Sequence, residues 1–65
     1  MEGKYKIGDI FRERESENIA IIVGRVLEWD EYWVDEYRKD GGISELLFTE
    51  YGIEKYYYKI EIEDV

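Results

Sequence analysis

The stretch Ile19-Ala20-Ile21-Ile22-Val23-Gly24-Arg25-Val26-Leu27-Glu28-Trp29 decides the fold of this 65-residue chain. Its apolar residues occupy both of the alternating positions of an extended strand, which predicts a strand with two apolar faces. The β-branched isoleucines and valines favour a strand over a buried helix of the same length. Gly24 interrupts the run and predicts a bulge or bend. We therefore expect a central strand buried on both sides, with the other segments arranged around it.

Further strand candidates flank this central run. Gly8-Asp9 predicts a turn before a first strand at residues 10–14, and the polar residues 15–18 predict a loop. Near the C-terminus, a strictly alternating segment gives the clearest strand pattern in the chain. Its predicted buried face contains Tyr56, Tyr58, Ile60 and Ile62, and its predicted solvent face contains Tyr57, Lys59, Glu61 and Glu63.

Residues 28–40 allow two interpretations. As a helix, the segment begins with acidic residues and ends with Arg38-Lys39 before Gly41-Gly42, in agreement with the helix macrodipole and with glycine C-caps. As a strand, it contains the β-forming Tyr32-Trp33-Val34, and Asp40-Gly41-Gly42 predicts a turn before a return strand. The strand is favoured, because neighbouring strands would leave a helix almost no connecting residues.

The return strand at residues 43–48 has an alternative of its own. Ser44 could instead cap a short helix that runs to Tyr51, with Gly52 behind it. Both interpretations agree that the segment follows a glycine turn and precedes the last strand.

Composition limits the classes of function. The chain has no Cys and no His, so it lacks disulfides and the commonest zinc ligands, and a single domain over residues 1–65 must depend on a dense aromatic core or a partner subunit. A net charge of −8 disfavours direct binding to nucleic acid, which relies on cationic contacts to phosphate. No apolar run approaches the length of a membrane span and no signal peptide is evident, which predicts a soluble cytoplasmic protein.

Residues suited to catalysis are scarce. The hydroxyl groups of Ser16, Ser44 and Thr49 have no evident base beside them in the sequence. The glycines form no phosphate-binding pattern, and a calcium loop begun at Asp30 has Asp35 where glycine is required. We therefore expect no enzymatic activity, no metal and no cofactor.

Acidic and aromatic residues are interleaved over residues 28–37. On the strand interpretation, Tyr32 and Val34 face one side, whereas Trp33, Asp35 and Tyr37 face the other. Carboxylates beside aromatic rings suit a Lys or Arg of a partner through charge pairing and cation–π attraction. The alternative is that the tryptophans are core and the carboxylates a solvated face. The candidate partner-binding residues are Glu28, Trp29, Asp30, Glu31, Trp33, Asp35, Glu36, Tyr37 and, on the last strand, Tyr57.

The order of these segments resembles small SH3-like barrels of the Tudor or chromo type. The resemblance covers most of the chain and rests on Gly8-Asp9, the strand at residues 19–28, and Tyr32-Trp33-Val34 leading into Asp40-Gly41-Gly42. It implies an all-β fold with a five-stranded barrel, and the alternative is an α+β fold with a helix over residues 28–40. Such barrels often bind peptides, some through aromatic cages for methylated Lys. Residues 43–51 depart from the short helical turn expected before the last strand.

These features predict a non-enzymatic protein that binds a basic protein surface. In one version, the acidic chain imitates nucleic acid and inhibits a nucleic-acid-binding enzyme, as inhibitors encoded by phages and mobile elements do. In the other version, it recognises a short cationic peptide. A homo-oligomer that holds a small ligand at its subunit junctions is a further alternative.

Overall fold

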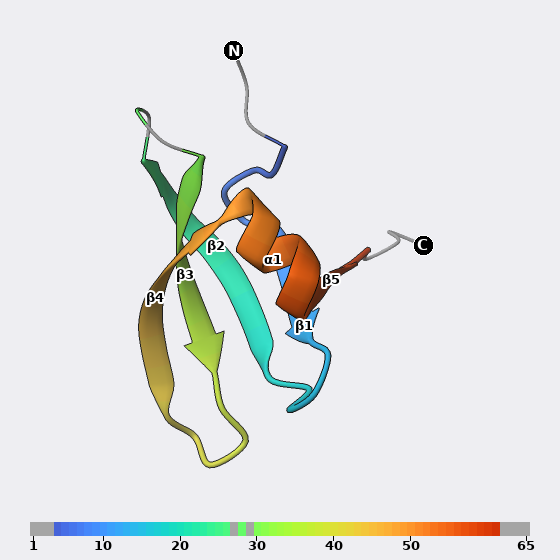
Figure 1. Ribbon diagram of the computed structural model, residues 1–65. Helices are drawn as coiled ribbons and strands as arrows, with labels where there is room; N and C mark the ends of the chain where they lie inside the picture. Colours follow the sequence, from blue (N-terminus) through green and yellow to red (C-terminus); the bar gives the residue numbers. More distant parts are fainter. Residues whose placement is uncertain (1–3, 27, 29, 62–65) are drawn as a thin grey trace.

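The computed structural model describes residues 4–26, 28 and 30–61 of the chain. Within these residues the elements are β1 (Ile10–Glu13), β2 (Ile19–Val26), β3 (Glu31–Tyr37), β4 (Ile43–Thr49), α1 (Glu50–Tyr56) and β5 (Tyr57–Ile60). All neighbouring strands pair antiparallel in the order β4-β3-β2-β1-β5, so β2 is central and β4 and β5 are the edges. Figure 1 shows α1 lying over one face of this twisted sheet.

The expected β fold is confirmed in outline, since five strands and one short helix make up the described chain. The alternative with a helix over residues 28–40 is wrong, because β3 occupies most of that segment. The expectation of a closed barrel is also wrong. β4 and β5 lie at opposite edges, and the chain passes between them through α1 instead of pairing them.

The central strand β2 contains the predicted bulge. Its pairing with β3 shifts between Ile22, which lies opposite Val34, and Gly24, which lies opposite Trp33. Val23 is the extra residue, so the alternation of side chains along β2 changes at this point. The prediction from Gly24 is therefore confirmed.

The hairpin between β3 and β4 has the predicted glycine turn. Gly41 adopts a φ of +92°, a left-handed conformation that glycine accepts without steric cost. The amide of Arg38 donates to the carbonyl of Gly42 at 2.8 Å, and the amide of Gly42 donates to Asp40 Oδ1 at 2.8 Å. This turn fixes an uninterrupted register from Tyr37 opposite Ile43 to Glu31 opposite Thr49.

The single described helix begins where β4 ends. Thr49 is its N-cap, and the Thr49 side chain accepts a hydrogen bond from the amide of Gly52 at 3.0 Å. The alternative helix capped by Ser44 is wrong, because every residue of β4 pairs with β3. The short helix expected before the last strand of an SH3-like barrel is nevertheless present. It is α1, which begins at Glu50, near the end of the segment 43–51.

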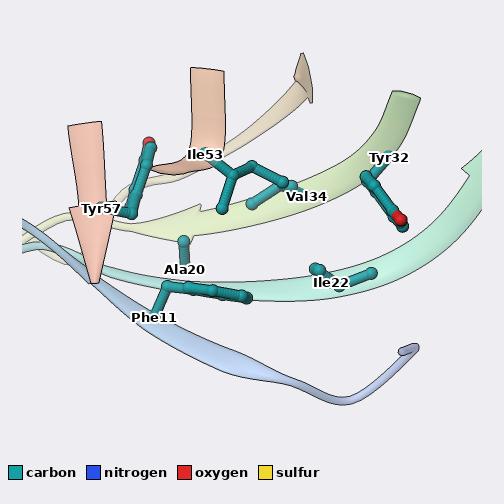
Figure 2. Packing of buried hydrophobic residues seen from close by; sticks show 7 residues of the cluster. All are labelled: Phe11, Ala20, Ile22, Tyr32, Val34, Ile53 and Tyr57. Carbon is teal, nitrogen blue, oxygen red and sulfur yellow. The ribbon is translucent and has the colours of Figure 1, made fainter. Parts of the chain in front are cut away.

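The core lies between α1 and one face of the sheet. Ile53 of α1 points toward Val34 and Ala20 (Figure 2). Tyr5, from the segment before β1, packs edge-on against Phe11 and Tyr32 with ring centroids 5.0 and 5.7 Å away. The buried hydrophobic residues, each 3% exposed or less, are Phe11, Ala20, Ile22, Tyr32, Val34, Ile53 and Tyr57. Three of these seven are aromatic, so aromatic side chains supply much of the volume of this small core.

The last strand is oriented opposite to the prediction. Tyr57 is buried, whereas Tyr58 is exposed and Ile60 is only partly buried. Tyr56, expected on the buried face, is the exposed last residue of α1. The alternation itself is present, but α1 covers the face that carries Tyr57, which the alternation could not specify. Ile62 and Glu63 lie outside the described residues.

Candidate interaction surface

Strand alternation and register divide the sheet into two faces. The covered face packs against α1 and forms the core. The opposite face, here called the open face, has no described element over it. Its residues are Ile10, Arg12, Ile19, Ile21, Gly24, Val26, Glu31, Trp33, Asp35, Tyr37, Ile43, Glu45, Leu47, Thr49, Tyr58 and Ile60.

Cross-strand pairing arranges the open face in four rows, of which the last is Thr49, Glu31 and Val26 and the first three are the more apolar. From β4 across the sheet, the first row is Ile43, Tyr37, Ile19, Arg12 and Tyr58. The second row is Glu45, Asp35, Ile21, Ile10 and Ile60, and the third row is Leu47, Trp33 and Gly24. Apolar and aromatic side chains dominate the first three rows, so the face as a whole is hydrophobic.

The half of the open face on β3 and β4 is the more solvent-accessible. Trp33, Tyr37, Ile43 and Leu47 are between 39% and 57% exposed. Trp and Tyr at the centre of such a patch are the residues that most often dominate binding energy at protein interfaces. Contiguous exposure of large apolar side chains on a small protein is typical of an interaction site.

Trp33 lies beside the bulge of β2. A Cβ built on Gly24 would be 3.5 Å from both Cβ and Cδ1 of Trp33, which is ordinary van der Waals contact. The Trp33 side chain therefore packs along the backbone of Gly24 while its outer surface faces solvent. This contact restricts the side chain before any partner binds, which lowers the entropy lost on association.

Two carboxylates interrupt the hydrophobic rows. Asp35 on β3 lies directly opposite Glu45 on β4, and side chains in such pairs have Cβ atoms about 4.5–5.5 Å apart. Neither residue takes part in an ion pair among the described residues. Like charges directly opposite each other destabilise a sheet, so this pair is unfavourable in the free protein.

The nearest cation on the open face does not compensate this pair. Arg12 lies on β1, two strands or about 9–10 Å from Asp35 across the sheet, and it is also offset from Asp35 by two residues along the strands. Its Nη1 donates to the carbonyl of Glu17 at 3.0 Å. A positive side chain from a partner would thus find two neighbouring carboxylates without a strong competing cation.

The structure brings together only part of the predicted site. Trp33, Asp35 and Tyr37 share the open face, which confirms the predicted alternation of β3. Glu31, the first residue of β3, is on the same face but is partly buried at its far end, while Glu28 and Asp30 are exposed in the connection between β2 and β3. Trp29 lies outside the described residues. The alternative that Trp33 is a core residue is wrong.

Glu36 and Tyr57 were expected on the surface, and that expectation is wrong. Both lie on the covered face, where the Tyr57 hydroxyl donates to Glu36 Oε1 and Asn18 Nδ2 donates to Glu36 Oε2 at 3.3 Å. Burial, followed by the hydrogen bond and charge of Glu36, raises the pKa of Tyr57 above its ordinary value. The phenol therefore remains a hydrogen-bond donor at neutral pH, and the pair stabilises the interior instead of offering a binding group.

Sequence reasoning missed the residues that β4 and β5 contribute. Ile43, Glu45, Leu47 and Tyr58 carry no motif, and their importance follows from the register that places them beside β3 and β1. The signal that could have found them is the alternation Ile43-Ser44-Glu45-Leu46-Leu47, which puts apolar and acidic groups on one side. That signal is short and identifies no partner strand.

No group of three or more acidic side chains is placed to hold a metal ion within residues 4–26, 28 and 30–61. Over the same part of the chain, none of the helical structure is long and apolar enough to cross a membrane. No protein-family model, curated protein or solved structure matches the chain. The physical character of the open face is therefore the main guide to function.

Proposed function

We propose that this chain is a non-enzymatic interaction module that binds a basic, partly apolar region of another protein through its open face. The observation that carries the proposal is the Asp35–Glu45 pair, two opposed carboxylates set between the exposed apolar rows. A Lys or Arg of the partner would relieve their mutual repulsion and could also contact the ring of Trp33 or Tyr37. Apolar groups beside that cation would cover Ile43 and Leu47.

The overall charge supports the same kind of partner. A net charge of −8 attracts cationic proteins from a distance and accelerates their encounter. It also opposes association of two copies of this chain. Hydrophobic burial then supplies the affinity that surface charge pairs alone provide only weakly.

The placement of the carboxylates favours recognition of a basic peptide over imitation of nucleic acid. A mimic needs carboxylates spread over one surface in place of phosphates, but the predicted acidic residues are divided between locations. Asp35 and, at the other end of β3, Glu31 lie on the open face, Glu36 is buried on the covered face, and Glu28 and Asp30 lie in the connection before β3. The open face is mainly apolar, which suits side-chain recognition.

An architectural relation to SH3-like modules is part of this proposal. The strand order β4-β3-β2-β1-β5 and a helix directly before the last strand support it. The sheet is open in this chain, so the relation would be to an unclosed form of the barrel. Aromatic-cage recognition is not included, because Trp33 and Tyr37 lie on an open sheet surface.

The test is a selection of binders from a random peptide library displayed on messenger RNA. The native protein is expected to enrich peptides in which Lys or Arg is flanked by apolar residues. A double variant, Asp35→Asn with Glu45→Gln, should lose the enrichment of basic residues. The matched control, Glu28→Gln with Asp30→Asn, removes the same charge away from the open face and should retain that enrichment.

Two results of this selection would contradict the proposal. One is enrichment of peptides without basic residues by the native protein. The other is equal enrichment of basic peptides by both double variants, which would show that net charge, and not the Asp35–Glu45 pair, attracts them.

A further inference from the structure

The two edges of the sheet differ in how well they are protected from pairing with another chain. β5 has four residues, and a short edge strand offers few unpaired backbone groups. β4 has seven residues, pairs with β3 without a bulge, and contains neither Lys nor Pro. No other described strand pairs with the outer side of β4. β4 therefore has the features of an edge that accepts an additional strand.

We infer that the partner binds as an extended strand that pairs with the outer edge of β4 and places a Lys or Arg opposite Glu45. This inference rests on the proposed function and specifies how the partner is recognised. Backbone hydrogen bonds to β4 would supply affinity, and side chains at alternating positions would supply specificity. The open face would then extend by one strand. Figure 1 shows no other described element along the outer side of the lower part of β4.

The sequence of the partner strand follows from the open-face residues of β4. Residues directly opposite each other in adjacent strands have side chains in contact. The partner should therefore carry apolar residues opposite Ile43 and Leu47 and a basic residue opposite Glu45. Because alternate residues share a face, the recognised pattern is apolar, any, basic, any, apolar.

Charge decides between a different protein and a second copy of this chain as occupant. Pairing of two β4 strands would bring two Asp35–Glu45 pairs to the same junction, so four carboxylates would lie within one strand length. Each copy would also carry a net charge of −8. A charged side chain on an edge strand is a common protection against self-pairing. Glu45 therefore opposes self-association and favours a cationic strand.

The experiment uses a blocked synthetic heptapeptide, Thr-Ile-Thr-Lys-Thr-Ile-Thr, titrated into the full isotopically labelled chain and followed by NMR. The expected chemical-shift changes concentrate at the backbone amides of Ile43–Thr49 and at the indole of Trp33. Two N-methylated peptides, one modified at the odd and one at the even residues, test the backbone. Because a strand at an edge pairs through alternate amides, one set should weaken binding by about tenfold or more and the other should change it little.

Charge is tested separately within the same titration. Replacing the peptide Lys by norleucine should weaken binding about two- to fivefold, as expected for a partly exposed ion pair. This difference should disappear in Glu45→Gln and persist in Glu15→Gln, an exposed site in the loop between β1 and β2. The Glu15 variant controls for the change in net charge.

The outcomes separate the two proposals. If the unmodified peptide and both N-methylated peptides bind with equal affinity, the inference of strand pairing is overturned while recognition of a basic partner stands. If the lysine and norleucine peptides bind equally, the charge recognition in the proposed function is overturned. Absence of any shift at β4 with millimolar peptide would overturn the strand inference, and the library selection would decide the proposed function independently.

Discussion

The two faces of the sheet are built from the same strands but satisfy different requirements. On the covered face, Ala20 and Ile22 are each 1% exposed, and the buried carboxylate of Glu36 accepts hydrogen bonds from Tyr57 and Asn18. On the open face, Ile43 is 57% exposed, and neither Asp35 nor Glu45 forms an ion pair with another described residue. The covered face is arranged for stability, whereas the open face retains unfavourable features that a partner could relieve.

The largest expected difference between the faces is in how much the free energy of unfolding falls when an isoleucine is replaced by alanine. Ile22→Ala should lower the free energy of unfolding by about 2–5 kcal/mol, because it leaves a cavity in the core. Ile43→Ala should change it by no more than about 0.5 kcal/mol, because the side chain is largely solvated. Urea denaturation followed by circular dichroism measures both values.

A milder core variant keeps this test informative if Ile22→Ala does not fold. Ile22→Val should cost about 0.5–1.5 kcal/mol, and Ile43→Val should cost less. Equal losses from the two faces would show that the open face is packed as tightly as the core, which would contradict the comparison.

An intermediate effect is expected from the tyrosines of the covered face at alkaline pH. Burial raises the pKa of Tyr5, Tyr32 and Tyr57 above 10.0 in the folded protein. Their contribution to stability is complete below pH 10 and is lost as the pH rises above it, since unfolded tyrosines ionise first. Each tyrosine that stays protonated only in the folded state should lower the free energy of unfolding by up to about 1.4 kcal/mol between pH 10 and 11.

Urea denaturation between pH 8 and 11 measures this loss. Tyr57→Phe should reduce the slope of stability against pH, because it removes the tyrosine with the largest rise in pKa. Tyr58→Phe, on the open face, is the matched control for the loss of a tyrosine hydroxyl group. A slope unaffected by Tyr57→Phe would mean that the covered face does not hold this phenol in its neutral form.

The smallest expected effect is a gain in stability on the open face. Glu45→Gln should raise the free energy of unfolding by about 0.2–1 kcal/mol, because it removes the repulsion with Asp35 across the strand pair. Glu15→Gln, in an exposed loop, should change stability less. Thermal denaturation at low ionic strength is the suitable measurement, since salt screens the repulsion between the two carboxylates. A loss of stability in Glu45→Gln would show that Glu45 is already compensated within the chain.

The sequence predicted the central strand, the bulge at Gly24 and the glycine turn after β3, because each has a local cause in side-chain alternation or backbone conformation. The choice of strand over helix for β3 was correct for the same reason. The position of α1 was not predicted. The cap at Thr49 and the single buried side chain Ile53 give a helix of seven residues too little periodicity to be recognised.

The candidate site was predicted only in part, because alternation separates two faces without saying which one is covered. This ambiguity placed Glu36 and Tyr57 on the surface, although α1 covers their side of the sheet. It also made β2 appear buried on both sides, because both of its faces are apolar. Trp33, Asp35 and Tyr37 were found from the sequence, but the opposition of Asp35 and Glu45 depends on a register between strands.

The pairing of β1 with β5 has a consequence for how the protein opens. Ile10 pairs with Ile60, whereas the hairpin of β3 and β4 joins Tyr37 to Ile43 through a short turn. Closing a loop between distant residues costs more entropy than closing a turn, so the β1–β5 seam forms only with most of the chain ordered. Because β5 is also a short edge strand at the end of the described chain, this seam should be the first to open, by local fraying. The amide protons of Ile10 and Ile60 should therefore exchange with solvent faster than that of Val34 in the interior strand β3.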